Sequence, residues 1–139
     1  WHDIDGKEVS LGARQFASRL DASNRPDAVI VVDMIAGRGL MLDVDFSCEE
    51  HGPSYDLALE LFRLGRSLSL PAFAMDKPQQ YKWISCDHTP FREADIPTAL
   101  LIDIDYPPWH TTDDSVRHCD ASSLGQVAAL LEAVIYGPR

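Results

Sequence analysis

The sequence predicts an α/β fold in which helices pack around a mixed, mostly parallel sheet. Residues 28–34 (AVIVVDM) form a β-branched run without apolar–polar alternation, and residues 98–102 (TALLI) form a second apolar run. Buried parallel strands show such runs. Segments with helical spacing of apolar residues alternate with these runs, which is typical of layered α/β domains. Because 139 residues suffice for one core but are few for two, we expect a single domain over residues 1–139.

The first part of the chain predicts one helix and two strands. Residues 11–20 carry apolar side chains at positions 11, 13, 16, 17 and 20, which is a helical spacing. The run 28–34 is bounded by Pro26 and Gly37 and predicts a buried strand. Residues 39–46 alternate less cleanly but also predict a strand.

The middle of the chain predicts a capped helix, a short strand and a loop. Ser54 is expected to cap a helix over residues 55–69. The inward face of this helix is expected to consist of Leu57, Ala58, Leu61, Phe62 and Leu68. A strand is expected over residues 72–75, and the polar stretch 76–81 predicts a loop.

The last part predicts a strand over residues 96–104 and a helix over 124–136, capped by Asp120 and ended by Gly137-Pro138. In open α/β sheets, functional sites lie beyond the carboxyl ends of the strands. The polar residues expected near such ends are Asp33, Asp103, Asp105 and His110.

The composition excludes several classes of partner. A formal net charge of −10 argues against nucleic-acid binding and would attract cations. No apolar run approaches the roughly 20 residues that span a bilayer, so no transmembrane segment is expected. The cysteines, Cys48, Cys86 and Cys119, form no C-x-x-C pair, which argues against a thiolate zinc site. Three reduced thiols are favoured over one disulfide with a free thiol.

His110 lies in the segment 107–114 (PPWHTTDD), beyond the apolar run 98–102. Proline fixes φ and lacks an N–H, so the strand should end by Pro107 and His110 should lie on a rigid loop. Such rigidity suits a metal ligand or a general base. A lone loop histidine, however, is more often structural or simply exposed.

Other candidate groups are carboxylates and one further histidine. Asp33 follows a valine-rich run, where a carboxylate is costly to bury unless it is paired or binds a cation; capping of backbone N–H groups is the alternative. Asp87 and His88 are adjacent, with a solvated loop pair as the alternative. Zinc takes imidazole and carboxylate ligands. Glu8, Asp33 and His110 stand in suitable contexts, but they are too few for a two-metal site.

Five blocks of the sequence, taken in order, carry a family resemblance. They are residues 5–8 (DGKE), 11–14 (LGAR), 31–34 (VVDM), 87–91 (DHTPF) with Ile96-Pro97, and 105–114 (DYPPWHTTDD). Together they resemble the zinc aminopeptidase and glutaminyl cyclase family over nearly the whole chain. The Trp-His-Thr and Asp-His-x-Pro-Phe blocks are the more specific ones.

The resemblance implies a three-layer α/β/α sandwich with a mixed sheet, and one or two zinc ions in an intact member. It implies that Glu8, Asp33 and His110 are metal ligands. In aminopeptidases the counterpart of Asp33 binds the second zinc, whereas in cyclases it joins a hydrogen-bond network. Asp87 matches the acidic residue of that network and, with Glu8, is the expected catalytic residue.

The same resemblance places Trp109 in the substrate pocket, and we expect Tyr106 and His88 beside it. Two departures stand out. Lys7 occupies the position of the family's general base, and a lysine ammonium cannot take a proton from a bound water near neutral pH unless it is strongly desolvated; a slipped register would make Glu8 the base. The family's His-x-Asp ligands and bridging aspartate would lie upstream of Trp1.

The chain is therefore expected to be the C-terminal portion of a catalytic domain, inactive alone. Its sheet is expected to be incomplete at the N-terminal side and to leave an apolar edge that a second copy or further chain covers. The first functional prediction is a zinc-dependent exopeptidase acting on peptides or small molecules with a free amino terminus. The alternatives are a glutaminyl-peptide cyclotransferase and a non-catalytic binding or scaffold domain, which Lys7 favours.

Overall fold

The computed structural model describes residues 10–74 and 84–137, without the side chains of Phe46 and Ser47. Three sequence predictions therefore lie outside the described residues: the role of Glu8, the role of Lys7 and the loop over 76–81.

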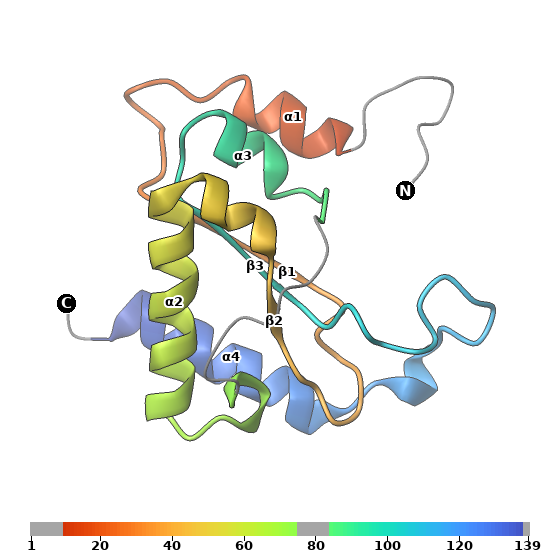
Figure 1. Cartoon of the computed structure of the whole chain (residues 1–139). Coiled ribbons are helices and arrows are strands. Elements are labelled where there is room, and N and C mark those ends of the chain that lie inside the picture. Colours follow the sequence, from red (N-terminus) through yellow and green to blue (C-terminus); the bar gives the residue numbers. More distant parts are fainter. Residues whose placement is uncertain (1–9, 75–83, 138–139) are drawn as a thin grey trace.

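The described strands form one small mixed sheet in the order β1-β3-β2 (Figure 1). The strands are β1 (Val29–Asp33), β2 (Asp43–Val44) and β3 (Thr98–Ile102). β1 pairs with β3 in parallel, whereas β2 pairs with β3 antiparallel. The predicted α/β class with a mixed sheet is confirmed.

Helices surround these strands. The α-helices are α1 (Leu11–Ala17), α2 (Gly52–Ser67), α3 (Thr89–Glu93) and α4 (Ala121–Tyr136), and the short 3-10 helices are η1 (Phe46–Glu50), η2 (Pro71–Phe73) and η3 (Val116–His118). None of the helices in the described ranges is long and apolar enough to cross a membrane.

The predicted cap of the last helix is confirmed, although the helix begins three residues earlier than expected. The Asp120 carboxylate accepts a hydrogen bond from the Ser122 backbone N–H at 2.7 Å, as N-caps do. Gly137 ends the helix, as predicted. The Asp120 backbone N–H also donates a hydrogen bond to the Ala36 carbonyl at 2.7 Å. This bond joins the start of α4 to the segment that follows β1.

The predicted cap of α2 is wrong by three residues. The helix begins after His51, with Pro53 in its first turn, where a missing N–H costs nothing. Ser54 is fully buried, and its Oγ accepts the Thr98 backbone N–H at 2.9 Å. Ser54 therefore ties the start of α2 to the start of β3.

Two other expectations about this region are also wrong. Residues 71–73 form the 3-10 turn η2, not a strand, because the Ala74 N–H donates back to the Pro71 carbonyl. The expected strand over 39–46 is reduced to β2. Leu68 is exposed, since α2 ends at Ser67.

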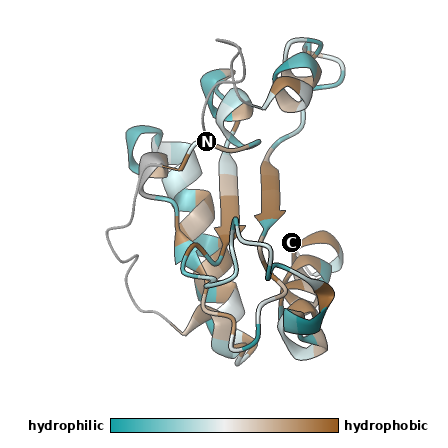
Figure 2. Ribbon diagram, turned by 90° about the vertical axis from the view of Figure 1, so that its right-hand side faces the viewer, coloured by the Kyte–Doolittle hydropathy of each residue, from teal (hydrophilic) through white to brown (hydrophobic). Residues whose placement is uncertain are grey.

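Alternation along the strands gives the sheet two different faces. The main core takes Ala99 and Leu101 of β3 together with Val44 of β2 and side chains of α2, η2 and α4. Residues one step along point to the other face, and Leu100 and Ile102 are buried there as well. Figure 2 shows these apolar strands at the centre, with helices around them.

β1 is an edge strand of the described sheet. Its residues are only partly buried, and Val32 is 41% exposed, whereas all five residues of β3 are buried. Half-covered apolar edge strands invite pairing with another chain or segment. The expectation that a second copy or further chain covers this edge stays a prediction.

Gly65 offers a test of the α2 packing. A Cβ at Gly65 would lie 2.7 Å from Cβ of the fully buried Phe73. We expect Gly65→Ala to lower the free energy of unfolding by about 1–3 kcal/mol through overpacking. Gly125→Ala in α4 is the matched control, because a Cβ there meets open space, and it should raise stability by about 0.5–1 kcal/mol. Urea denaturation measures both; equal effects would contradict the packing.

Candidate active site

The site begins with three residues in one row across the sheet. Asp33 of β1 and Asp43 of β2 both pair with Ile102, the last residue of β3. Residues in one row point to the same face, and this face is opposite to the main core. The carboxyl ends of the parallel strands β1 and β3 therefore bring carboxylates to one edge, as the sequence predicted.

Asp33 is half-buried and accepts a hydrogen bond from a cysteine. The Cys86 Sγ lies 3.7 Å from Asp33 Oδ2. Burial raises the pKa of the Cys86 thiol, and the negative charge of Asp33 adds to this rise. The thiol therefore stays protonated at neutral pH and donates to the carboxylate. Met34, the next residue, has a left-handed backbone (φ 51°), which turns the chain sharply away from β1.

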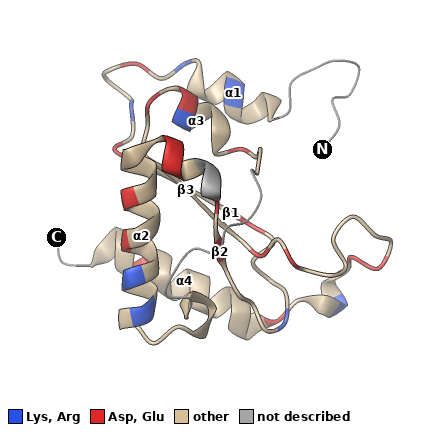
Figure 3. Ribbon diagram, in the orientation of Figure 1, with Lys and Arg blue, Asp and Glu red and all other residues tan. Residues whose placement is uncertain are grey.

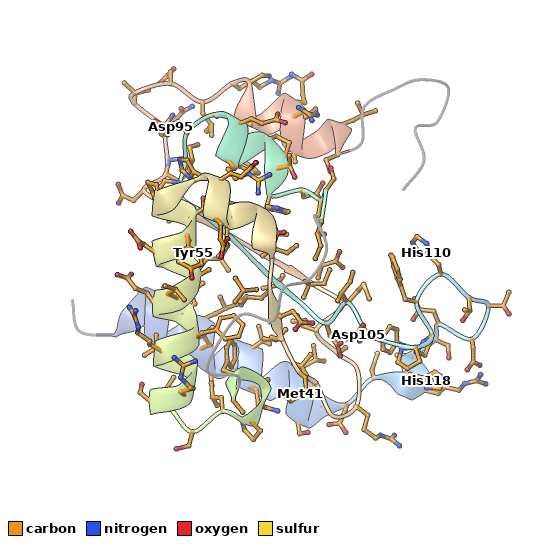
Figure 4. The ribbon with its side chains drawn as sticks, in the orientation of Figure 1. Met41, Tyr55, Asp95, Asp105, His110 and His118 are labelled. Atoms are coloured by element: carbon orange, nitrogen blue, oxygen red, sulfur yellow. The ribbon has the colours of Figure 1, made fainter. Side chains whose placement is uncertain are left out.

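His110 stands on a loop that projects beyond the strand ends (Figure 4). Turn hydrogen bonds from Trp109 N–H to the Tyr106 carbonyl (3.1 Å) and from Thr111 N–H to the Pro108 carbonyl (3.0 Å) order this loop. His110 has φ 59° and is exposed, and its ring stacks on Trp109 with the centroids 4.4 Å apart. The predicted loop position of His110 is confirmed. Its role as a metal ligand stays a prediction.

The base of the His110 loop is joined to the segment that follows β1. Gly37 and Cys119 form an isolated antiparallel bridge, and the buried Ser123 Oγ donates to the Gly37 carbonyl at 2.7 Å. The Tyr106 ring packs so closely on Gly37 that a Cβ there would lie 3.0 Å from it. The segments carrying Asp33 and His110 therefore meet through Gly37.

Tyr106 lies between two hollows. One, of about 240 Å³, also has Asp33, Gly37 and Asp114 in its wall. The other, of about 600 Å³ and more open, is lined by Arg38, Tyr106, Pro107, Pro108, Thr111, Asp113 and His118. The Tyr106 hydroxyl donates to Asp114 Oδ1 at 3.1 Å. Tyr106 and Asp33 thus line the same hollow, and the expected substrate contact of Tyr106 stays a prediction.

Asp87 is exposed, whereas His88 is buried, with 2% of its surface accessible. His88 Nε2 lies 2.8 Å from Oδ2 of Asp45, and Arg92 Nη1 lies 3.5 Å from the same oxygen. This burial leaves His88 no surface for the substrate contact that was expected. No local sequence pattern signals the pairing of His88 with Asp45 and Arg92, because Asp45 lies 43 residues from His88.

The described residues do not assemble a metal site by themselves. No three His, Cys, Asp or Glu side chains within 10–74 and 84–137 come together to hold an ion. Of the three predicted ligands, Asp33 and His110 are described and Glu8 is not. This part of the chain therefore does not supply a complete set of zinc ligands. Cys48, Cys86 and Cys119 are free thiols.

Acidic residues gather where β1 and β3 leave the sheet (Figure 3). Burial raises the pKa of Asp43 to about 6, and the negative charges of Asp105 and Asp103 add to this rise. Burial also raises the pKa of Asp103, while a hydrogen bond from the Asp105 N–H opposes that rise. The Asp43 carboxyl therefore changes charge between mildly acidic and neutral pH.

Comparison with known proteins gives a consistent result. The sequence family described as Peptidase family M28 matches residues 5–135. An uncharacterized protein of Saccharomyces cerevisiae, YFR018C, is 43% identical over 49 residues, covering 34% of this chain and 14% of the yeast protein.

Solved structures share the fold. A leucine aminopeptidase precursor from Bacteroides thetaiotaomicron (23% identity) and a glutaminyl cyclase from Fimbriiglobus ruber (21% identity) both give a TM-score of 0.81 over 98% of this chain and 48% of theirs. A Zn-dependent exopeptidase from Parabacteroides distasonis gives 0.83 at 18% identity, over 99% of this chain and 49% of its own. The chain spans about half the length of these structures.

The Asp43 carboxyl predicts a pH dependence of stability. Because its pKa is raised in the folded protein, the folded state binds this proton more tightly. The resulting stabilisation is fully present below the unfolded pKa and is lost as pH rises through about 6. Relative to wild type, we expect Asp43→Asn to raise the free energy of unfolding by about 1–3 kcal/mol more at about pH 7.5 than at about pH 4.

Urea denaturation at both pH values measures this difference. Asp105→Asn is the control, since Asp105 is exposed and acts on Asp43 only through its charge; its effect should be smaller. The same stability difference between Asp43→Asn and wild type at both pH values would contradict the assignment.

Proposed function

Because this chain belongs to peptidase family M28, we propose that its strand-end residues form part of the site of a zinc-dependent exopeptidase that removes N-terminal residues from peptides. One observation carries the proposal. Asp33 and the His110 loop follow adjacent parallel strands, and the segments that bear them pack together at Gly37. Two ligand types of zinc, a carboxylate and an imidazole, thus belong to one edge of the sheet.

The charge of the site suits the proposed substrate. A free amino terminus is cationic, and Asp33 and Asp114 both lie in the wall of the smaller hollow. The formal net charge of −10 adds a long-range attraction for cations. We propose that Trp109 and Tyr106 contact the substrate near this hollow, on a loop whose turn hydrogen bonds and prolines limit its motion.

The proposed ligands and catalytic residues extend beyond the described part of the chain. We propose Glu8, Asp33 and His110 as zinc ligands, and Glu8 with Asp87 as the groups that handle protons. Zinc would be a cofactor of the whole protein, since the described residues supply only two of these three ligands. The activity of the whole protein, its substrates and its partners belong to this proposal.

A glutaminyl-peptide cyclotransferase is the second candidate, and one observation favours it. Asp33 is already engaged in a hydrogen bond with the Cys86 thiol. The family resemblance assigns this aspartate to a hydrogen-bond network in cyclases and to a second zinc in aminopeptidases. A third candidate, a non-catalytic binding domain, is favoured by Lys7 at the position of the general base.

Activity of the full-length, zinc-loaded protein tests these alternatives. We expect release of nitroaniline from aminoacyl-nitroanilides, and its loss on chelation with recovery when zinc returns. His110→Ala should lower this activity and the zinc content, the activity by at least about 100-fold, since even residues behind metal ligands contribute 10–100-fold. His51→Ala, a change at a histidine that lines neither hollow, is the control and should leave both unchanged.

The same preparations are assayed on peptides with an N-terminal glutamine. Cyclisation of these peptides without nitroaniline release would contradict the exopeptidase proposal and support the cyclotransferase. Absence of both activities in a zinc-loaded protein would favour the third candidate, a non-catalytic binding domain. Equal activity of wild type and His110→Ala would remove His110 from the site.

A further inference from the structure

A buried acid–histidine pair lies on the same side of the sheet as Asp33. Asp45 is 3% exposed and His88 is 2% exposed, and their Oδ2 and Nε2 atoms are 2.8 Å apart. Arg92 adds a longer contact of 3.5 Å to the same oxygen. Buried polar groups are costly unless they are paired, so this contact strongly constrains where His88 lies.

Asp45 is itself fixed to the sheet. It follows β2 directly, and β2 is held on β3 by backbone pairing. The Asp45 carbonyl also accepts the Cys48 N–H at 3.1 Å, as η1 begins. Asp45 is therefore held beside β2, the edge strand opposite to the one that carries Asp33.

A tight turn transmits the position of His88 to Cys86. The Thr89 N–H donates to the Cys86 carbonyl at 3.0 Å, and the Cys86 N–H reaches Thr89 Oγ1 at 3.4 Å. The His88 carbonyl accepts the Arg92 N–H at 3.2 Å, which joins the turn to α3. Once His88 is anchored, Cys86 has little freedom to move separately.

This turn crosses the sheet face. At one end His88 contacts Asp45 beside β2, and at the other the Cys86 Sγ contacts Asp33 at the end of β1. We propose that the Asp45–His88 pair is a latch that holds Cys86 against Asp33, which makes Cys86, His88 and Asp45 positioning residues of the candidate site. The inference rests on the proposed function only for the role of Asp33.

The reactivity of Cys86 tests the latch without any assay of activity. The probe is iodoacetamide at fixed pH, with alkylation followed separately at each cysteine by peptide mass spectrometry. Cys119 is exposed and reports reagent strength, while Cys48 is buried and reports unfolding. In His88→Leu we expect the alkylation rate of Cys86 to rise by at least about 10-fold through local opening, with Cys48 and Cys119 unchanged.

His88→Gln is the rescue variant, since its amide nitrogen can replace Nε2 as the partner of Asp45. His88 Nδ1 has no hydrogen-bond partner in the described structure. Replacing the ring by glutamine therefore removes no hydrogen bond at that nitrogen. We expect its Cys86 rate to stay within about 3-fold of wild type. Asp95→Asn is the matched control, because it alters the exposed His51–Asp95 pair, 2.9 Å apart, and should leave Cys86 unchanged.

Asp45→Asn examines the latch from its other partner and keeps the inference testable if His88→Leu does not fold. It should raise the Cys86 rate selectively. A wild-type Cys86 rate in both variants would overturn the proposal. So would a parallel rise at Cys48, which would mean that the pair stabilises the whole fold. A selective rise at Cys86 in a protein without peptidase or cyclase activity would uphold the latch while the proposed function fails.

Discussion

The parallel pairing of β1 with β3 is the constraint on which the rest of the structure depends. Its register sets Asp33 opposite Ile102, and the antiparallel pairing of β2 sets Asp43 opposite the same residue. A shift of one residue would turn Asp33 toward the apolar core and Val32 toward the site, because side chains alternate between faces. The apolar packing of Ala99 and Leu101 against α2 and α4 thus determines which face carries the carboxylates.

Buried side-chain hydrogen bonds then fix the segments around that sheet. Ser54 joins α2 to the start of β3, Ser123 joins α4 to Gly37, and His88 joins the turn before α3 to Asp45. Each of these hydrogen bonds holds its segment in one position. Leaving a buried polar group unpaired destabilises the fold by more free energy than a typical hydrogen bond contributes. Apolar contacts define the layers, and these polar contacts define where each connecting segment lies relative to the strand ends.

The same division explains how much could be predicted from the sequence. The strands β1 and β3 and the Asp120 cap follow from local patterns, since β-branched runs and cap residues act on their immediate neighbours. The position of His110 on a loop followed from the prolines. The pairing of Asp45 with His88 could not be predicted, because it joins segments 43 residues apart. Ser54 was misread for a related reason: its hydroxyl serves a distant strand rather than its own helix.

The chemistry of the strand ends is governed by how negative charge is distributed among close carboxylates. Asp33 receives a thiol hydrogen bond, which stabilises its charge. Asp43 has no such donor among the described contacts, and burial together with Asp105 and Asp103 makes its ionisation unfavourable until pH rises to about 6. Asp33 itself lies in the wall of the hollow that it shares with Tyr106. A cationic group that enters this hollow therefore meets the carboxylates of Asp33 and Asp114 in its wall.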